Sequence, residues 1–132
     1  MIKFEVEGIP VAQGSMTGFN VKGKVVLTHQ NAKKLKPWRE KIKNEAKKYF
    51  EEPAAKDVAI MVILDFWMPR PKTVTRKFYT VEPDIDKLIR AVLDGLTGVA
   101  YIDDKQVVSV ISNKLYVEDA EPGVVIAVSM LE

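Results

Sequence analysis

The chain has 132 residues, of which 47% are hydrophobic and 29% charged, with a net charge of +2 and no cysteine. This length and composition predict one globular domain over residues 1–132, and they exclude disulfides and thiolate metal sites. The single histidine disfavours a zinc site. No apolar run approaches the roughly 20 residues that a membrane-spanning helix needs. Because no signal-peptide pattern opens the chain either, we expect a cytoplasmic protein without a membrane segment.

The first half of the chain predicts two strands and a basic helix. Apolar and charged residues alternate over residues 2–7, which is typical of a strand with one buried face. A loop over 8–14 follows, and a short strand over 24–28 is expected to pair with the first strand or an adjacent edge. Apolar residues then recur at helical spacing, which predicts a helix over about 37–50 with a proline in its first turn.

The second half predicts a central strand, a helix and two further strands. The apolar run over 58–67 is typical of a strand covered on both faces, and the proline-containing stretch over 68–81 is expected to be a mobile loop. Apolar residues from Ile85 onward follow the i, i+3, i+4 pattern of an amphipathic helix that ends at Gly95 or Gly98. Strands over 106–117 and 124–130 are expected to form an antiparallel pair. The fold class is therefore α+β, with a mixed sheet of about five strands and two main helices in the order β-β-α-β-α-β-β.

Basic residues gather in two places, although the net charge is small. Eight of the sixteen residues over 33–48 are lysine or arginine, and the loop over 68–81 carries four more. Such groups favour a polyanionic partner, while a lysine-rich helix that serves only solubility is the alternative. The residues expected to contact a nucleic acid are Lys33, Lys34, Lys36, Arg70, Lys72, Arg76 and Lys77.

Five aspartates, Asp84, Asp86, Asp94, Asp103 and Asp104, fall within 21 residues of the second helix and the segment after it. Carboxylate oxygens beside basic residues suit Mg²⁺ or Mn²⁺ and a phosphate substrate. On a helical wheel Asp86 borders the apolar stripe and Asp94 faces away from it. A fold that brings the Asp103–Asp104 turn alongside would complete a cluster of carboxylates. Alternatively, these residues are helix caps, turn residues and surface groups.

The order of residues in this region resembles a known family. The string Pro-Asp-Ile-Asp-Lys-Leu-Ile-Arg-Ala-Val-Leu-Asp-Gly-Leu-Thr-Gly, followed by Asp-Asp-Lys-Gln-Val-Val, is similar to the motif of the RusA family of Holliday junction resolvases. Spacing and flanking residues agree over about twenty-five positions, and the rest of the chain agrees more loosely. The resemblance implies a RusA-like fold over the whole chain.

The resemblance also implies roles for particular residues. The family's metal-binding carboxylates match Asp84, Asp86 and Asp104, with Asp103 as an adjacent candidate, and its catalytic lysine falls on Arg90. Lys87 stands where the family usually has asparagine. Arginine stabilises charge on a phosphate but does not give up a proton near neutral pH, so the division of roles between Lys87 and Arg90 stays open.

Together the family resemblance and the charge pattern imply an enzyme. We expect an endodeoxyribonuclease that uses Mg²⁺, with Mn²⁺ as a substitute, and that resolves four-way DNA junctions by paired cuts as a homodimer. Trp67, Phe78 or Tyr79 are candidates to stack on splayed bases at the crossover. Two alternatives remain open: a non-catalytic DNA-binding module, and a metal-dependent nuclease that acts on other branched DNA.

Overall fold

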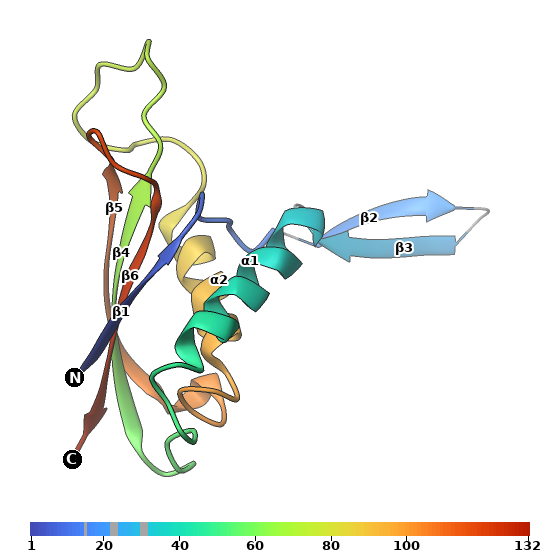
Figure 1. Ribbon diagram of the computed structural model, residues 1–132. Helices are drawn as coiled ribbons and strands as arrows, with labels where there is room; N and C mark the ends of the chain where they lie inside the picture. Colours follow the sequence, from blue (N-terminus) through green and yellow to red (C-terminus); the bar gives the residue numbers. More distant parts are fainter. Residues whose placement is uncertain (15, 22–23, 30–31) are drawn as a thin grey trace.

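The fold pairs a four-stranded sheet with two helices on one of its faces (Figure 1). This computed structural model describes residues 1–14, 16–21, 24–29 and 32–132. Within them, no helix is long and apolar enough to cross a membrane. The elements are β1 (Ile2–Glu7), β2 (Met16–Val21), β3 (Lys24–His29), α1 (Ala32–Ala46), β4 (Ala59–Met68), α2 (Ile85–Leu96), the short 3₁₀ helix η1 (Asp104–Gln106), β5 (Val107–Tyr116) and β6 (Gly123–Leu131).

The strand order in the main sheet is β1-β6-β4-β5. Strand β6 runs antiparallel to both β1 and β4, whereas β5 runs parallel to β4 after the chain has crossed through α2. The expected antiparallel pairing of the last two strands is therefore wrong, because β4 lies between them. The apolar β4 is central, as predicted, and it is hydrogen-bonded along both edges. The α+β class with a mixed sheet and two helices is confirmed.

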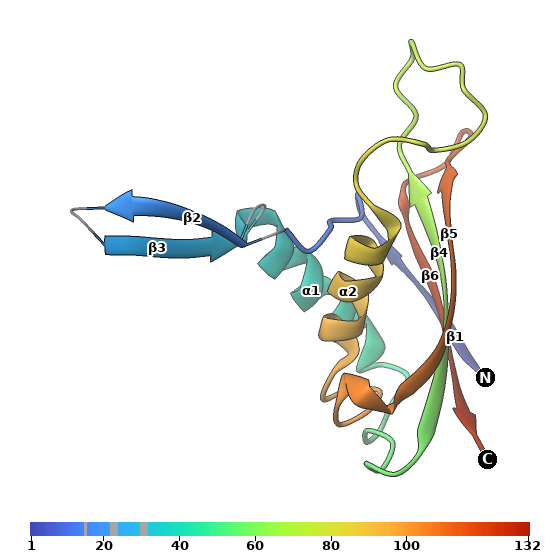
Figure 2. The ribbon, with the colours of Figure 1, turned by 180° about the vertical axis from the view of Figure 1, so that it is seen from behind.

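A separate two-stranded sheet, formed by β2 and β3, projects away from the main sheet (Figures 1 and 2). The two strands pair antiparallel, from Met16 opposite His29 to Val21 opposite Lys24. The strand expected over 24–28 thus exists, but its partner is β2, which the sequence pattern did not predict. Consequently the predicted sheet of about five strands is instead a sheet of four and a hairpin of two.

The hydrophobic core lies between the sheet and the helices. Alternate residues of β4 are buried on the helix side, and β1 and β6 contribute to the same layer. Helix α1 begins earlier than expected, so Pro37 stands inside the helix and not in its first turn. At the crossing of α1 and α2, a Cβ added to Gly95 would lie 3.1 Å from Ile42 Cγ2. The close approach of the helices explains a glycine in the middle of the Asp-Gly-Leu motif.

The opposite face of the main sheet is not covered by any helix within the described residues (Figure 2). The second set of alternate residues on β4, which includes Met61, Ile63, Asp65 and Trp67, is half-buried or exposed there. The expectation that β4 is covered on both faces is therefore wrong. The molecule has one face built from helices and one face built from open sheet.

Candidate active site

The N-terminal end of α2 presents two carboxylates that the fold does not use. Asp84 occupies the N-cap position with extended backbone angles, yet its side chain makes no capping hydrogen bond. Asp86 lies in the first turn and is exposed. Among the described residues neither side chain has an ion-pair partner. The helix dipole favours negative charge at this end, so both groups are available as oxygen ligands.

A hollow of about 370 Å³ adjoins Asp84. The loop over 9–14, Lys34 of α1, the segment over 82–84 and Lys87 of α2 line it. The backbone N–H of Gln13 donates to the Lys87 carbonyl at 3.0 Å, which ties the loop to the first turn of α2. The Gln13 side-chain oxygen Oε1 is buried without a hydrogen-bond partner in the described part of the chain. Sequence reasoning missed Gln13, for which the only signal was a polar residue inside an otherwise apolar loop.

Lys114 of β5 holds the segment that leads into Asp84. Its Nζ donates to the Val81 carbonyl at 3.0 Å and to the Pro83 carbonyl at 2.9 Å, and it lies 5.0 Å from the centre of the Tyr79 ring. Two charge-assisted hydrogen bonds therefore fix the backbone just before the first candidate ligand. Sequence reasoning missed this residue as well, because Lys114 is 30 positions from Asp84 along the chain.

Arg90 lies one turn beyond Asp86 and is tethered by Asp94. The Arg90 Nε and Asp94 Oδ1 atoms are 3.7 Å apart, and the other oxygen of Asp94 lies 3.7 Å from Arg39 Nη1 of α1. The Asp94 side chain is only 24% exposed, whereas that of Arg90 is 61% exposed. Asp94 is therefore not a free surface residue, and it connects the basic face of α1 with the basic position of α2.

Asp103 and Asp104 lie at the opposite end of α2. The 12 residues of this helix span about 18 Å at a rise of about 1.5 Å per residue. The described residues hold no group of three or more acidic or histidine side chains that could bind a metal ion. One chain therefore does not assemble the expected cluster of Asp84, Asp86, Asp103 and Asp104.

The Asp103 side chain is used by the fold itself. It caps η1 by accepting from the Lys105 backbone N–H at 3.0 Å, and Gln106 completes a capping box. This backbone hydrogen bond is the main reason that the pKa of Asp103 lies below its usual value. Asp104 lies in the first turn of η1 and is half-buried beside Asp103. Because the cap uses Asp103, Asp104 is the better ligand candidate of the two.

Buried polar contacts also fix this end of the helix. Gln106 Oε1 accepts from the backbone N–H groups of Ile102 and Asp103, at 2.9 and 3.0 Å. Its Nε2 donates to the carbonyls of Ala55 and Val58, at 2.7 and 3.1 Å. The Gln-Val sequence after the paired aspartates therefore has a structural explanation.

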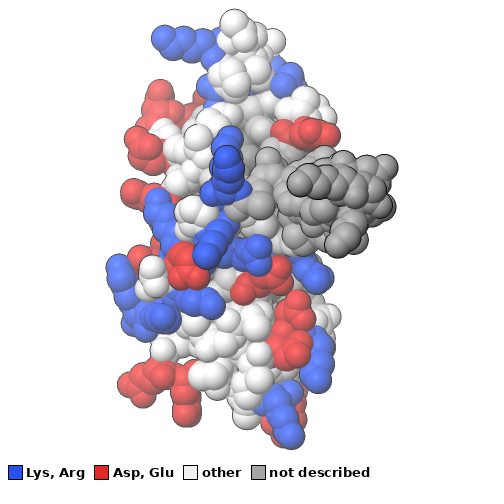
Figure 3. All heavy atoms as spheres, turned by 90° about the vertical axis from the view of Figure 1, so that its right-hand side faces the viewer, with Lys and Arg blue, Asp and Glu red and all other residues white. Residues whose placement is uncertain are grey.

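The basic residues of α1 lie alongside α2, from its Asp84 end to Asp94. Lys33, Lys34 and Lys36 are exposed, and Lys34 also lines the hollow beside Asp84. A second hollow of about 330 Å³, between α1 and α2, is lined by Lys36, Arg39, Lys43 and Asp94, among others. Figure 3 shows lysine and arginine side chains across the middle of this helical face, with acidic groups between them.

The basic loop over 69–84 is irregular, and two of its four predicted DNA contacts are engaged within the protein. Arg70 pairs with Glu118 at 2.9 Å and donates to the Arg76 carbonyl, and Arg76 Nε donates to the Tyr116 hydroxyl at 2.9 Å. Lys72 and Lys77 are exposed. Phe78 is 68% exposed in this loop, whereas Tyr79 packs on Tyr116 and Trp67 lies on the open face of the sheet. Of the three aromatic candidates, Phe78 is the most exposed.

Comparison with known proteins identifies the family of this chain. Residues 7–129 match the family of the endodeoxyribonuclease RusA, which is nearly the whole chain. The chain is also 30% identical over 142 residues to the uncharacterized protein YqaN of Bacillus subtilis (strain 168), an alignment that covers 95% of this chain and 94% of YqaN. The protein therefore belongs to the RusA family of endodeoxyribonucleases.

Proposed function

We propose that the protein is a metal-dependent endonuclease that resolves four-way DNA junctions. The observation that carries this function is the unengaged pair Asp84 and Asp86, which shares one end of α2 with Lys87 and Arg90. The family match makes DNA the substrate class. Specificity for branched DNA and the need for a metal are part of the proposal.

The donor set suits Mg²⁺ better than a transition metal. Mg²⁺ in proteins is commonly held by one or two carboxylates together with water and substrate phosphate. Asp84 and Asp86 supply two such carboxylates at a helix N-terminus, an end that also favours phosphate. When bound there, the metal supplies an acidified water and neutralises charge on the phosphate oxygens.

The neighbouring side chains bind and orient the scissile phosphate. Lys87 lines the hollow beside Asp84, and Arg90 lies one turn further along α2; we assign both cations to the scissile phosphate. Gln13 lines the same hollow, and its buried side-chain oxygen has no hydrogen-bond partner among the described residues. Lys114 keeps Asp84 in place through the two carbonyls that precede it.

A homodimer joined along β5 accounts for the separation of the carboxylates. Strand β5 is an edge of the sheet and exposes Val108, Val110 and Ile111. An antiparallel pairing of two β5 edges around a two-fold axis also sets the two α2 helices antiparallel. The Asp84 end of one helix then faces the Asp104 end of the other. Each active site would thus take ligands from both chains, and two sites would act on one junction.

The function is tested by incubating the protein with a synthetic four-way junction, linear duplex and a flap substrate. Paired cleavage of the junction with Mg²⁺ or Mn²⁺, and none with EDTA, is expected. Ca²⁺ should bind but support little turnover, because its looser coordination positions water poorly. Cleavage that persists in EDTA overturns the metal site, and metal-independent junction binding without cleavage indicates a DNA-binding module. Preferential cutting of flaps indicates another branched substrate.

The shared site is tested by mixing two inactive variants, Asp86→Asn and Asp104→Asn. A mixed dimer contains one site with both substitutions and one site with neither, so single-strand nicking of the junction should return. The matched control mixes Asp86→Asn with Asp84→Ala, which leaves every site of the mixed dimer defective. Val110→Lys should lower the mass measured by light scattering toward a monomer. Recovery in the control or none in the test mixture contradicts the shared arrangement.

A further inference from the structure

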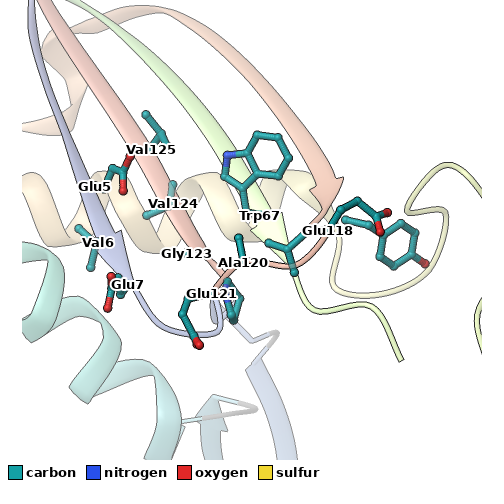
Figure 4. A pocket seen from close by; sticks show the side chains of 13 residues that line it. Glu5, Val6, Glu7, Trp67, Glu118, Ala120, Glu121, Gly123, Val124 and Val125 are labelled. Carbon is teal, nitrogen blue, oxygen red and sulfur yellow. The ribbon is translucent and has the colours of Figure 1, made fainter. Parts of the chain in front are cut away.

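The open face of the sheet carries a hollow of about 520 Å³ at the end where β4 finishes. Figure 4 shows the indole ring of Trp67 standing over the sheet in this hollow, with Glu5 and Glu7 along β1 on one side and Glu118 on the other. Val125 and Ala120 also contribute to its lining. It lies on the face opposite the helices, so it is distinct from the candidate active site.

Trp67 is uncovered because its neighbour has no side chain. In the register of β4 and β6, Trp67 stands opposite Gly123. A Cβ on Gly123 would lie 2.6 Å from the Val6 carbonyl oxygen, so a larger residue is excluded there. As a result, Trp67 is 37% exposed, although large aromatic side chains are mostly covered in folded proteins. The space beside the ring is a consequence of close packing between β1 and β6.

The rim of the hollow is acidic, which determines the chemistry of an occupant. Glu5, Glu7 and Glu121 line it without an ion-pair partner among the described residues, whereas Glu118 is paired with Arg70 at 2.9 Å. Carboxylates repel the phosphates of DNA and attract cations, and the face of an indole ring also attracts cations. The basic residues predicted to contact DNA lie on α1 and in the loop over 69–84.

We propose that this hollow binds a short basic segment of a partner protein, with a lysine or arginine next to an apolar residue. The cation lies over the Trp67 ring and between the glutamates, while the apolar residue packs against Val125 and Pro122. The basic residues of α1 lie on the helix side of the molecule, so a junction bound there leaves the hollow open, although Arg70 of the basic loop pairs with Glu118 at its rim. This inference does not depend on which DNA the enzyme cleaves.

The test measures binding of a fluorescein-labelled peptide with the core Leu-Arg-Lys-Leu by fluorescence anisotropy. Saturable binding that weakens with added salt is expected, and none for a peptide with the core Leu-Glu-Glu-Leu. Glu5→Gln with Glu121→Gln should weaken binding about five- to tenfold, and Trp67→Ala by a similar or larger factor. The matched control is Glu51→Gln with Glu52→Gln, which removes the same charge from exposed positions outside the hollow and should change little.

Three outcomes overturn the proposal. If both double variants weaken peptide binding equally, the peptide is attracted only by the net charge of the protein. The absence of saturation shows that the hollow is not a binding site. A fall in molecular mass of Trp67→Ala without peptide, while its melting temperature is retained, shows that a second copy of the chain occupies the hollow. Cleavage of the junction by Glu5→Gln with Glu121→Gln should be unchanged, which separates this test from that of the active site.

Discussion

Two aspartates occupy helix N-cap positions in this protein, and the fold treats them in opposite ways. Asp103 accepts a backbone hydrogen bond and takes part in a complete capping box at η1. Asp84 occupies the same position on α2 but makes no side-chain capping bond, although an aspartate cap would stabilise a helix by about 1 kcal/mol. A longer helix thus forgoes the stabilisation that a single 3₁₀ turn obtains.

The difference separates a structural end of α2 from a chemical end. At the structural end, Asp103 and Gln106 form hydrogen bonds with each other's backbone in a capping box. At the chemical end, Asp84, Asp86 and the Gln13 oxygen have no such partners among the described residues. Polar side chains without hydrogen-bond partners are expected where residues are kept for function and not for stability. The two ends of α2 should therefore respond differently to substitution.

Asp86→Asn should have the largest effect. Asparagine keeps the size of the side chain but removes the charge that a divalent ion requires, so junction cleavage should fall by about three orders of magnitude or more. The melting temperature should change little because Asp86 is exposed. Junction binding should persist or tighten, since one charge facing the phosphates is lost. Asp57→Asn, at an exposed turn, is the matched control. Near-normal cleavage by Asp86→Asn would show that Asp86 is a surface residue and not a metal ligand.

Gln106→Leu should give the opposite result, with a loss of stability. Leucine has a similar size but leaves the N–H groups of Ile102 and Asp103 and the carbonyls of Ala55 and Val58 without this partner. We expect a fall of about 3 kcal/mol in the free energy of unfolding, measured by urea denaturation. Lys105→Met, at the exposed neighbouring position, should stay within about 0.5 kcal/mol of the parent. An unchanged midpoint for Gln106→Leu would show that water replaces the amide.

Local patterns predicted the elements of the fold better than their pairing. The amphipathic repeat predicted α2, and the apolar run predicted the central position of β4. The pairing of β5 with β4 is a long-range choice that no alternation pattern encodes, since both edges of an apolar strand look alike in sequence. Strand β2 was missed because Gly18 and Asn20 interrupt a strand pattern.

The candidate site was predicted in part for the same reason. Asp84, Asp86 and Lys87 are neighbours in sequence, so one helix end necessarily brings them together. Gln13 and Lys114 reach the same place from distant segments, and only the folded chain shows this. The distance between the two ends of α2 follows from the helix length. The sequence of one chain does not encode in a local pattern how a second chain would bring the Asp84 end next to an Asp104 end. The catalytic roles themselves stay predictions.

Lys114→Met should have an intermediate effect on activity and a small one on stability. Methionine keeps the length of the side chain but removes the hydrogen bonds to the Val81 and Pro83 carbonyls, so the segment before Asp84 loosens. Small displacements of a catalytic group are costly, and we expect about a tenfold slower cleavage step together with a higher Mg²⁺ requirement. Titration of Mg²⁺ in single-turnover assays measures both. Lys56→Met, at an exposed position, is the control, and a parental rate for Lys114→Met would show that Lys114 does not position Asp84.

Asp103 should show the smallest effect, which is visible only as a function of pH. Its pKa is lowered below the usual 3.8, mainly by the Lys105 backbone N–H, so the folded state favours the charged form. The resulting stability is fully present above the unfolded value of 3.8 and is lost as the pH falls through the lower folded pKa. Asp103→Asn keeps an oxygen that can cap η1 but removes the charge. Its melting temperature should therefore lie slightly below that of the parent at pH 7, and the two should converge once the pH falls below the lowered folded pKa of Asp103. A difference in melting temperature that is independent of pH would mean that the cap depends on shape and not on charge. A large loss of cleavage at pH 7 would show that Asp103 takes part in the reaction.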